Sequence, residues 1–188
     1  GNLELFGRRK DGSEFPIEIE LSHIETTTGL MVMSFIIDIT ERRQAAAALR
    51  EQRDFLQQVI DSVPNLIMVK DRAGRFELVN QPTAQIYDLT LTSMLGKTDS
   101  DIHRNATETD AFKAQDQMVL QNGQPLFIPE SQFGDRYYQT NIIPLKNAMA
   151  QIDRLLVVCS DITERKQAEA LLQQALEKEK ELSELKSR

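Results

Sequence analysis

Cysteine and histidine, which often form metal sites and serve as nucleophiles or bases, are scarce in this chain of 188 residues. It contains one cysteine, Cys159, and two histidines, His23 and His103, and their spacing matches no metal site. We find no glycine-rich phosphate loop, no paired carboxylates suited to acid–base catalysis and no activated nucleophile. The sequence therefore predicts neither a catalytic residue nor a metal site in this segment.

A five-residue sequence occurs twice in the chain and marks its organisation into modules. Residues 38–42 read Asp-Ile-Thr-Glu-Arg, and the same five residues return at 161–165. Each copy follows an apolar, strand-like run and precedes a charged, Ala/Leu-rich, helix-like run. Fewer residues precede the first copy than separate the two, so we expect the chain to start inside a module.

The repeated residues form a predicted junction between a strand and a helix. In each copy an aspartate or threonine oxygen can accept hydrogen bonds from the free N–H groups at the start of the helix. We expect the arginine of each copy to pair with the aspartate and hold the exit angle, at a gain of about 0.2 to 1 kcal/mol. The six candidate signal-junction residues are Asp38, Thr40, Arg42, Asp161, Thr163 and Arg165.

Composition limits the class of protein. A net charge of -7 and a pI near 5.0 argue against nonspecific binding to nucleic acid or to an anionic membrane surface, because both need a basic surface. No apolar run approaches the roughly 18 residues of a membrane span, and the N-terminus has no signal-peptide pattern. We therefore expect a cytoplasmic segment without direct membrane contact.

Strand and helix signals divide the chain into four parts. Residues 1–39 read as three strands, 40–62 as a linker helix, 63–162 as a complete module and 163–188 as an exit helix. In the complete module, strands are predicted at 66–70, 76–80, 126–130, 136–145 and 154–160, with helices at 82–87, 92–95 and 108–121. Strands at both ends with helices between them predict an α+β domain with an antiparallel sheet.

Both helices carry apolar residues at spacings of three and four, as in a coiled coil. The seam residues are Leu49, Leu56, Val59, Leu171, Ala175, Leu182 and Leu185. We expect a parallel homodimer, because each seam directly follows the repeated junction. The alternative is that these helices pack as amphipathic helices on a neighbouring domain.

Strand alternation selects the candidates for a ligand pocket in the complete module, although it does not say which face is inward. Polar groups among apolar ones are typical of a small-ligand site, whereas a core filled by phenylalanine and methionine side chains is the competing interpretation. The strand candidates are Phe76, Leu78, Asn80, Tyr138, Thr140, Ile142, Leu156 and Val158, and the candidates that could line or fill the space are Phe112, Met118 and Phe127.

The junction sequence, the turn at 71–74 followed by Phe-Glu-Leu-Val-Asn, and Gly-Lys-Thr-Asp at 96–99 together resemble PAS sensory domains. The resemblance covers 63–165 fully, while residues 3–43 are similar only to the last three strands of a preceding PAS domain. It implies a five-stranded sheet with helices on one face, a cavity between them, and a signal leaving through the junction. Residues 182–188 resemble the entry into the dimerisation helix of a sensor histidine kinase.

The resemblance also bears on cofactors. Haem-binding PAS domains hold iron with a histidine from the helical segment, but we expect His103 to be a surface or hydrogen-bonded residue. Light-sensing flavin PAS domains use a cysteine in a helical Asn-Cys-Arg-Phe motif, whereas Cys159 stands in the last predicted strand and is expected to be a small packed residue. The sequence thus disfavours haem and flavin and identifies no cofactor.

These features predict the sensory input and relay segment of a two-component sensor histidine kinase. Its kinase core would lie in the same polypeptide, and the signal would be either a small-molecule ligand or a conformational change. Two alternatives remain: a ligand-free PAS scaffold for dimerisation, and the input module of a diguanylate cyclase.

Overall fold

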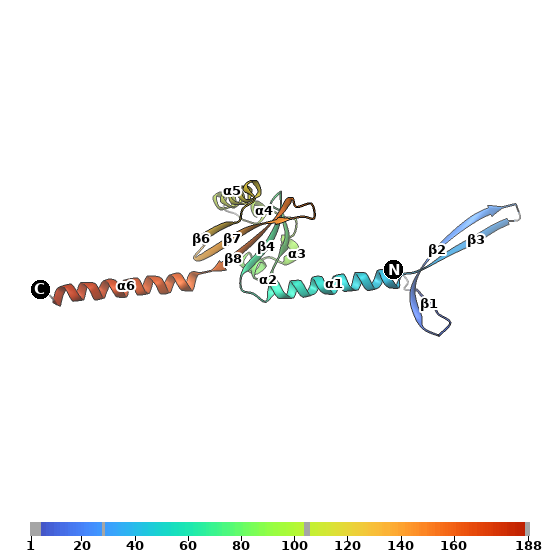
Figure 1. Cartoon of the computed structure of the whole chain (residues 1–188), viewed down its shortest axis with the longest axis horizontal. Helices are drawn as coiled ribbons and strands as arrows, with labels where there is room; N and C mark the ends of the chain where they lie inside the picture. Colours follow the sequence, from blue (N-terminus) through green and yellow to red (C-terminus); the bar gives the residue numbers. More distant parts are fainter. Residues whose placement is uncertain (1–4, 28, 104–105, 187–188) are drawn as a thin grey trace. The chain divides into compact units, whose positions relative to one another are not determined.

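The computed structural model describes residues 5–27, 29–103 and 106–186. It divides into two compact units, Gly1–Gln58 and Val59–Arg188, each with its own sheet (Figure 1). No helix in these described stretches is both long and apolar enough to cross a bilayer.

The first unit is an antiparallel sheet of three strands in the order β1-β2-β3. The strands are β1 (Leu5–Arg8), β2 (Glu14–Thr26) and β3 (Gly29–Asp38), and all three lie within the predicted range 1–39. Helix α1 (Thr40–Asp61) follows directly. The β1–β2 turn is stabilised by Asp11, whose carboxylate accepts hydrogen bonds from the backbone N–H and the hydroxyl of Ser13.

This small sheet leaves its apolar side chains exposed. Leu21 is 72% exposed, and every residue of β3 is exposed as well. Three strands alone provide too little surface to bury such side chains, so this sheet needs further structure packed against it.

The second unit contains a five-stranded antiparallel sheet in the order β5-β4-β8-β7-β6. Its strands are β4 (Leu66–Asp71), β5 (Phe76–Val79), β6 (Leu126–Phe133), β7 (Arg136–Lys146) and β8 (Ile152–Asp161). Four helices separate β5 from β6: α2 (Gln81–Ile86), α3 (Leu91–Met94), α4 (Asp99–Ile102) and α5 (Ala106–Asn122). Helix α6 (Thr163–Lys186) follows β8. The predicted α+β fold is confirmed.

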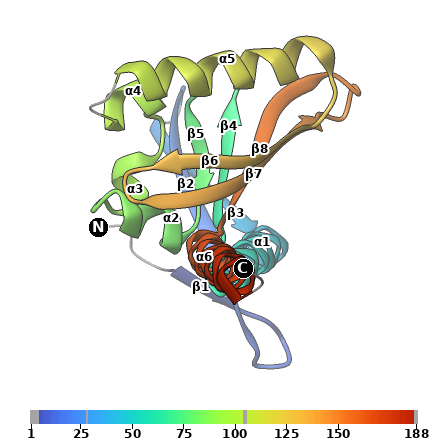
Figure 2. The same ribbon diagram turned by 90° about the vertical axis from the view of Figure 1, so that its left-hand side faces the viewer.

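Figure 2 shows α5 lying across one face of this sheet, where it packs against β7 and β8, while α2 packs against β4. Local signals explain most boundaries: Asn80 caps α2 by accepting from the N–H of Thr83, and Gly123 ends α5 at a φ of 67°. Helix α4 was not predicted, because it has only four residues in a polar stretch.

The core of the second unit shows which strand faces point inward. In β4, Leu66, Met68 and Lys70 are buried and alternate with less buried residues. In β8 the buried residues are Leu155 and Val157, so Leu156 and Val158 lie on the opposite face. The choice of Leu156 and Val158 as pocket candidates is therefore wrong.

The register between β7 and β8 explains why Leu155 and Val157, and not Leu156 and Val158, face the core. Thr140 pairs with Cys159, and Ile142 pairs with Val157. Directly opposite residues in an antiparallel pair point to the same face, so an inward Ile142 requires an inward Val157. A sequence shows alternation within a strand, but not the register between strands.

Candidate ligand cavity

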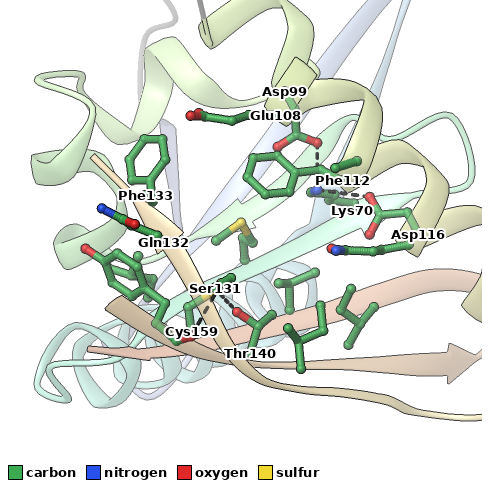
Figure 3. A pocket seen from close by; sticks show the side chains of 18 of the residues that line it. Lys70, Asp99, Glu108, Phe112, Asp116, Ser131, Gln132, Phe133, Thr140 and Cys159 are labelled. Atoms are coloured by element: carbon green, nitrogen blue, oxygen red, sulfur yellow. Dashed lines mark hydrogen bonds and ion pairs between the residues drawn. The ribbon is translucent and has the colours of Figure 1, made fainter. Parts of the chain in front are cut away.

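A cavity of about 210 Å³ lies between the sheet and α5. Figure 3 shows side chains from the sheet and from the helical segment converging on it. Its apolar wall comes from β4, α5, β6, β7 and β8, with contributions from Leu66, Met68, Phe112, Ile128, Ile142 and Val157. A concave, mostly apolar space with a few polar groups has the general makeup of a small-molecule site.

Four of the eleven residues predicted for a pocket line this cavity: Phe112, Tyr138, Thr140 and Ile142. Phe76 is 2% exposed and belongs to the core beside it, while Leu78 is half-buried and does not line it. Met118 and Phe127 are about half exposed, at 50% and 54%. The interpretation that Met118 and Phe127 fill the space is therefore wrong.

Asn80, predicted as a polar contact to a ligand, instead connects three parts of the fold. Its side chain is fully buried and accepts from the N–H of Ile67 at 3.0 Å. Its amide group donates to the carbonyl oxygens of Ile60 at 2.9 Å and Asn65 at 2.8 Å. The side chain thereby holds the end of α1, the start of β4 and the start of α2 together, and it does not line the cavity.

The main site residues that sequence reasoning missed form a buried ionic cluster. Lys70 Nζ on β4 donates to Asp99 Oδ2 at 2.7 Å and to Asp116 Oδ2 at 2.9 Å (Figure 3). These three side chains are only 4%, 7% and 10% exposed, and all line the cavity. The alternation of Leu66, Met68 and Lys70 contained the signal, because it places the lysine on the buried face of the strand.

Burial and charge act in opposite directions on the pKa values in this cluster. Burial lowers the pKa of Lys70, but the attraction of Asp99 and Asp116 outweighs it, so the pKa lies above the usual 10.5. Burial raises the pKa of Asp116 more than the Lys70 ammonium lowers it, so this pKa lies above 3.8. The lysine stays protonated, while two carboxylates share its charge.

His103 is a buried, hydrogen-bonded residue behind the cavity wall. Its Nε2 lies 2.9 Å from the hydroxyl of Tyr87, and its ring stacks edge-on against Phe112 and Phe133. Burial lowers the pKa of His103 below 6.5, although Asp99 and Glu108 act to raise it. Of the two expected environments, the hydrogen-bonded one is correct and the surface one is not.

Cys159 lies on the cavity wall in β8, where the Thr140 hydroxyl donates to its Sγ at 3.4 Å. Burial raises the pKa of its thiol, which disfavours the reactive thiolate. Within the described ranges, no group of three or more His, Cys, Asp and Glu side chains is arranged to hold a metal ion.

The junction after β8 attaches α6 to the sheet. The N–H of Ile162 donates to the carbonyl oxygen of Tyr137 at 2.8 Å, and the N–H of Tyr137 donates to Thr163 Oγ1 at 3.0 Å. Asp161 Oδ1 accepts from the N–H of Thr163 at 2.9 Å. Burial raises the pKa of Asp161, but the hydrogen bonds from Thr163 and Arg136 lower it by a larger amount. The pKa of Asp161 therefore lies below its usual 3.8.

The first copy of the junction repeats this geometry with one difference. Ile39 donates to the carbonyl oxygen of Pro16 at 3.1 Å, and Asp38 Oδ1 accepts from the N–H of Thr40 at 2.9 Å. Pro16 has no N–H, so Thr40 Oγ1 cannot act as Thr163 Oγ1 does. It donates to Asp38 Oδ1 instead, at 2.6 Å.

The expected pairing of the two junction arginines with the aspartates is wrong. Arg42 pairs with Glu18 at 2.9 Å, and Arg165 lies 3.6 Å from Glu169 one helical turn further on. The partners of Asp38 and Asp161 come from the sheet side instead, as Arg9 at 2.8 Å and Arg136 at 2.9 Å. The arginine at the start of each helix points along the helix or back to β2. Each aspartate therefore pairs with an arginine from the sheet side of the junction.

The predicted seam residues on α1 and α6 are exposed in the single chain. Leu49 is 68%, Leu56 57%, Val59 46%, Leu171 68% and Leu182 59% exposed, and Ala175 is exposed too. The side chain of Leu185 and the final residues 187 and 188 lie outside the described part of the chain.

Family models match both units. A model described as "PAS fold" matches residues 60–167, more than half of the chain, and one described as "PAS domain" matches residues 1–41. The chain therefore belongs to the PAS family, and its second unit is a PAS sensory domain.

Similar proteins include a virulence sensor protein and a regulatory histidine kinase. The chain is 35% identical over 75 residues to the virulence sensor protein BvgS of Bordetella pertussis, covering 38% of this chain and 6% of that protein. It is 26% identical over 138 residues to the methanogenesis regulatory histidine kinase FilI of Methanothrix harundinacea, covering 71% and 15%. The chain thus spans a small part of these relatives.

The structure of the PAS domain of Bordetella pertussis BvgS has the same fold. It superposes with a TM-score of 0.53 at 23% identity, covering 68% of this chain and 98% of that one.

Proposed function

We propose that this chain is the sensory input and relay segment of a cytoplasmic sensor histidine kinase. The second PAS domain would respond to a small molecule in its cavity and pass the response through the junction into α6. A kinase core elsewhere in the same polypeptide would receive it, and this segment itself would catalyse nothing. The similarity to BvgS and FilI supports a kinase core as the receiver of the signal.

One observation carries the proposal: Tyr137 and Tyr138 are neighbours in β7 and serve opposite ends of the relay. The Tyr138 side chain lines the cavity, while the backbone of Tyr137 makes two hydrogen bonds to the first residues of the exit segment. Lys166 adds an ion pair between α6 and Glu130 of β6 at 2.8 Å. A displacement of these two strands would therefore move the base of α6.

A ligand changes the output only if it binds two states of the domain with different affinity. In the proposed mechanism these states differ in the position of β6 and β7, and hence in the orientation of α6. Parallel pairing of α6 with a second copy would convert that orientation into a change at the kinase core. The exposed leucines of α1 and α6 support such pairing.

The test uses the full-length protein that carries this chain, with autophosphorylation as the readout. Thr163→Val removes the acceptor for the Tyr137 N–H, so we expect an altered autophosphorylation rate in a protein that remains folded. Thr163→Ser keeps the acceptor and should behave like the wild type. Equal rates for all three proteins would contradict the relay.

A ligand-free dimerisation scaffold is the second candidate, favoured by the same exposed leucines. It predicts that Thr163→Val changes neither dimerisation nor output. The two candidates therefore differ in the autophosphorylation of one variant.

A further inference from the structure

Tyr138 contributes a buried hydroxyl without a hydrogen-bond partner to the cavity wall. The residue lines the cavity from β7 and is only 4% exposed. Within residues 5–27, 29–103 and 106–186, no atom forms a hydrogen bond with the Tyr138 hydroxyl. Arg136, two residues earlier in β7, donates to Asp161 Oδ2 at 2.9 Å and not to this oxygen. Because a buried hydroxyl without a partner is costly, a ligand that accepts a hydrogen bond from it would remove that cost.

The other hydroxyls on the cavity wall already have partners. Tyr87 Oη lies 2.9 Å from His103 Nε2. The Ser131 hydroxyl donates to the backbone carbonyl oxygen of Tyr138, and the Thr140 hydroxyl donates to a cysteine sulfur, both at 3.4 Å. Among the wall residues that the structure describes, Tyr138 is therefore the one whose hydroxyl hydrogen lacks an acceptor. A matching ligand carries that acceptor, such as a carbonyl oxygen or a ring nitrogen.

The ionic cluster disfavours a charged ligand. Lys70 is the only lysine or arginine among the described wall residues, and its Nζ already donates to Asp99 at 2.7 Å and to Asp116 at 2.9 Å. An anion beside this lysine would also meet both carboxylates, and a cation would have to displace the lysine from its place between them. Charge that leaves water without gaining a partner of its own is costly. The wall therefore favours an uncharged ligand.

Aromatic rings lie next to Tyr138 on the cavity wall. The centroid of the Phe133 ring is 6.5 Å from that of Tyr138 and 6.0 Å from that of Tyr87. All three residues line the cavity, as does Phe112. Aromatic rings attract one another in offset or edge-on arrangements at centroid distances of about 4.5 to 7 Å. An aromatic ligand can make such contacts while its acceptor reaches the Tyr138 hydroxyl.

The volume of the cavity limits the size of the ligand. About 210 Å³ corresponds to roughly seven water molecules at their share of liquid volume. Sites for drug-sized ligands usually measure about 300 to 1,000 Å³. The occupant is therefore a small molecule, such as a single ring with a short substituent.

We propose that the cavity binds a small uncharged aromatic molecule whose hydrogen-bond acceptor receives the hydroxyl hydrogen of Tyr138. This inference rests on the proposed sensory function, because it names the chemical class of the signal that the second PAS domain detects. Together with Leu66 and Phe133, Tyr138 also lines a second cleft, whose wall includes Arg136 and Asp161. A hydrogen bond to Tyr138 therefore acts beside the residues from which α6 starts.

The unpaired hydroxyl can be tested without a ligand. Tyr138→Phe removes only this group, so we expect the melting temperature of the full chain to stay the same or to rise. Circular dichroism measures the transition. A melting temperature lower by more than about 2 °C would show that the hydroxyl already has a partner, and would overturn the proposal.

Two probes of the same shape test the acceptor. Acetophenone has a carbonyl oxygen where α-methylstyrene has a methylene group, and two-dimensional NMR titration of the full chain measures how tightly each binds. We expect a dissociation constant below about 1 mM for acetophenone. Tyr138→Phe should weaken acetophenone about three- to tenfold and change α-methylstyrene less than about twofold, because only the carbonyl loses a hydrogen bond.

Tyr137→Phe is the matched control, since it makes the same change one residue away at a side chain outside the cavity wall. It should leave both dissociation constants unchanged. Equal effects of Tyr138→Phe on the two probes would overturn the proposal, as would equal effects of the two substitutions on acetophenone. Failure of acetophenone to bind at millimolar concentration would overturn it too.

Benzoate tests the charge of the ligand, because it places an ionised carboxylate where acetophenone has its acetyl group. We expect benzoate to bind the wild-type chain at least about tenfold more weakly than acetophenone near neutral pH. Equal or tighter binding of benzoate would overturn the assignment of an uncharged ligand.

If Tyr138→Phe does not fold, the wild-type chain supplies the same test. Tyrosine isotope-labelled at Cζ gives one NMR signal for each of the three tyrosines, and acetophenone should shift the Tyr138 signal more than α-methylstyrene does. Equal shifts would overturn the hydrogen bond. The Thr163→Val experiment needs no ligand, so failure of the aromatic probes would leave the relay standing, while an unchanged kinase rate would leave the cavity chemistry standing.

Discussion

Ile162 and Tyr137 are joined by a backbone hydrogen bond of 2.8 Å at the single residue between β8 and α6. Ile39 and Pro16 form the corresponding bond of 3.1 Å before α1. In both copies the helix is thus attached to the neighbouring strand and not only to the strand that it follows. The repeat in the sequence is a repeat of this attachment.

Replacement of Lys70 should strongly destabilise the second unit. Lys70→Met leaves Asp99 and Asp116 buried without a counter-ion, so we expect a loss of about 3 to 5 kcal/mol in the free energy of unfolding. Urea denaturation followed by circular dichroism measures it. Lys97→Met, at an exposed lysine, should cost less than about 0.5 kcal/mol. A similar cost for both variants would show that the cluster is not the buried unit described here.

Neutralising the whole cluster gives a complementary result. Adding Asp99→Asn and Asp116→Asn to Lys70→Met removes the uncompensated charges, so the triple variant should recover much of the lost stability. If it is less stable than Lys70→Met alone, the cost comes from packing and not from charge.

Stability should fall as the pH drops below neutral, because of His103. Its folded-state pKa lies below the usual 6.5, so the folded state binds the proton less readily than the unfolded state. The stability contributed by neutral His103 is complete above pH 6.5 and is lost as the pH falls through the folded-state pKa, by at most about 1.4 kcal/mol per pH unit. Urea denaturation across this range measures the slope.

His103→Gln should flatten that slope. His23→Gln should leave it unchanged, since His23 is exposed on β2. An unchanged slope in His103→Gln would assign the pH dependence to another group.

A charge in the α6 seam should disrupt the proposed dimer. Leu171 is 68% exposed in the single chain, so Leu171→Glu costs the fold little but places a charge in the helix pair. We expect the dimer dissociation constant to rise at least about tenfold, measured by sedimentation equilibrium. Ala170→Glu introduces the same charge at an exposed position away from the seam and should leave the constant unchanged. The seam assignment fails if both variants dimerise like the wild type.

The strands and helices were largely predictable because their signals are local. The turn at 71–74, the cap at Asn80 and the glycine after α5 each act within a few residues, and the structure places boundaries at or near them. The repeated junction was predictable for the same reason.

The cavity was only partly predictable because it depends on pairing between distant segments. Which face of β8 points inward follows from its register with β7, and the ionic cluster joins β4 to two helices that come later in the chain. Asn80 shows the limit most clearly, since the same amide could contact a ligand or connect secondary-structure elements. Only its five hydrogen bonds to Ile67, Ile60, Asn65 and Thr83 decide between these roles.

The most direct test of the relay changes the phase of α6 without touching the cavity. In the full-length protein, one alanine inserted between Gln174 and Ala175 rotates everything beyond it by about 100°, while seven restore the original face to within about 20°. We predict that one residue changes the autophosphorylation rate severalfold and that seven return it close to the wild-type value. Equal rates after both insertions, whether altered or unaltered, would contradict a relay through the orientation of α6.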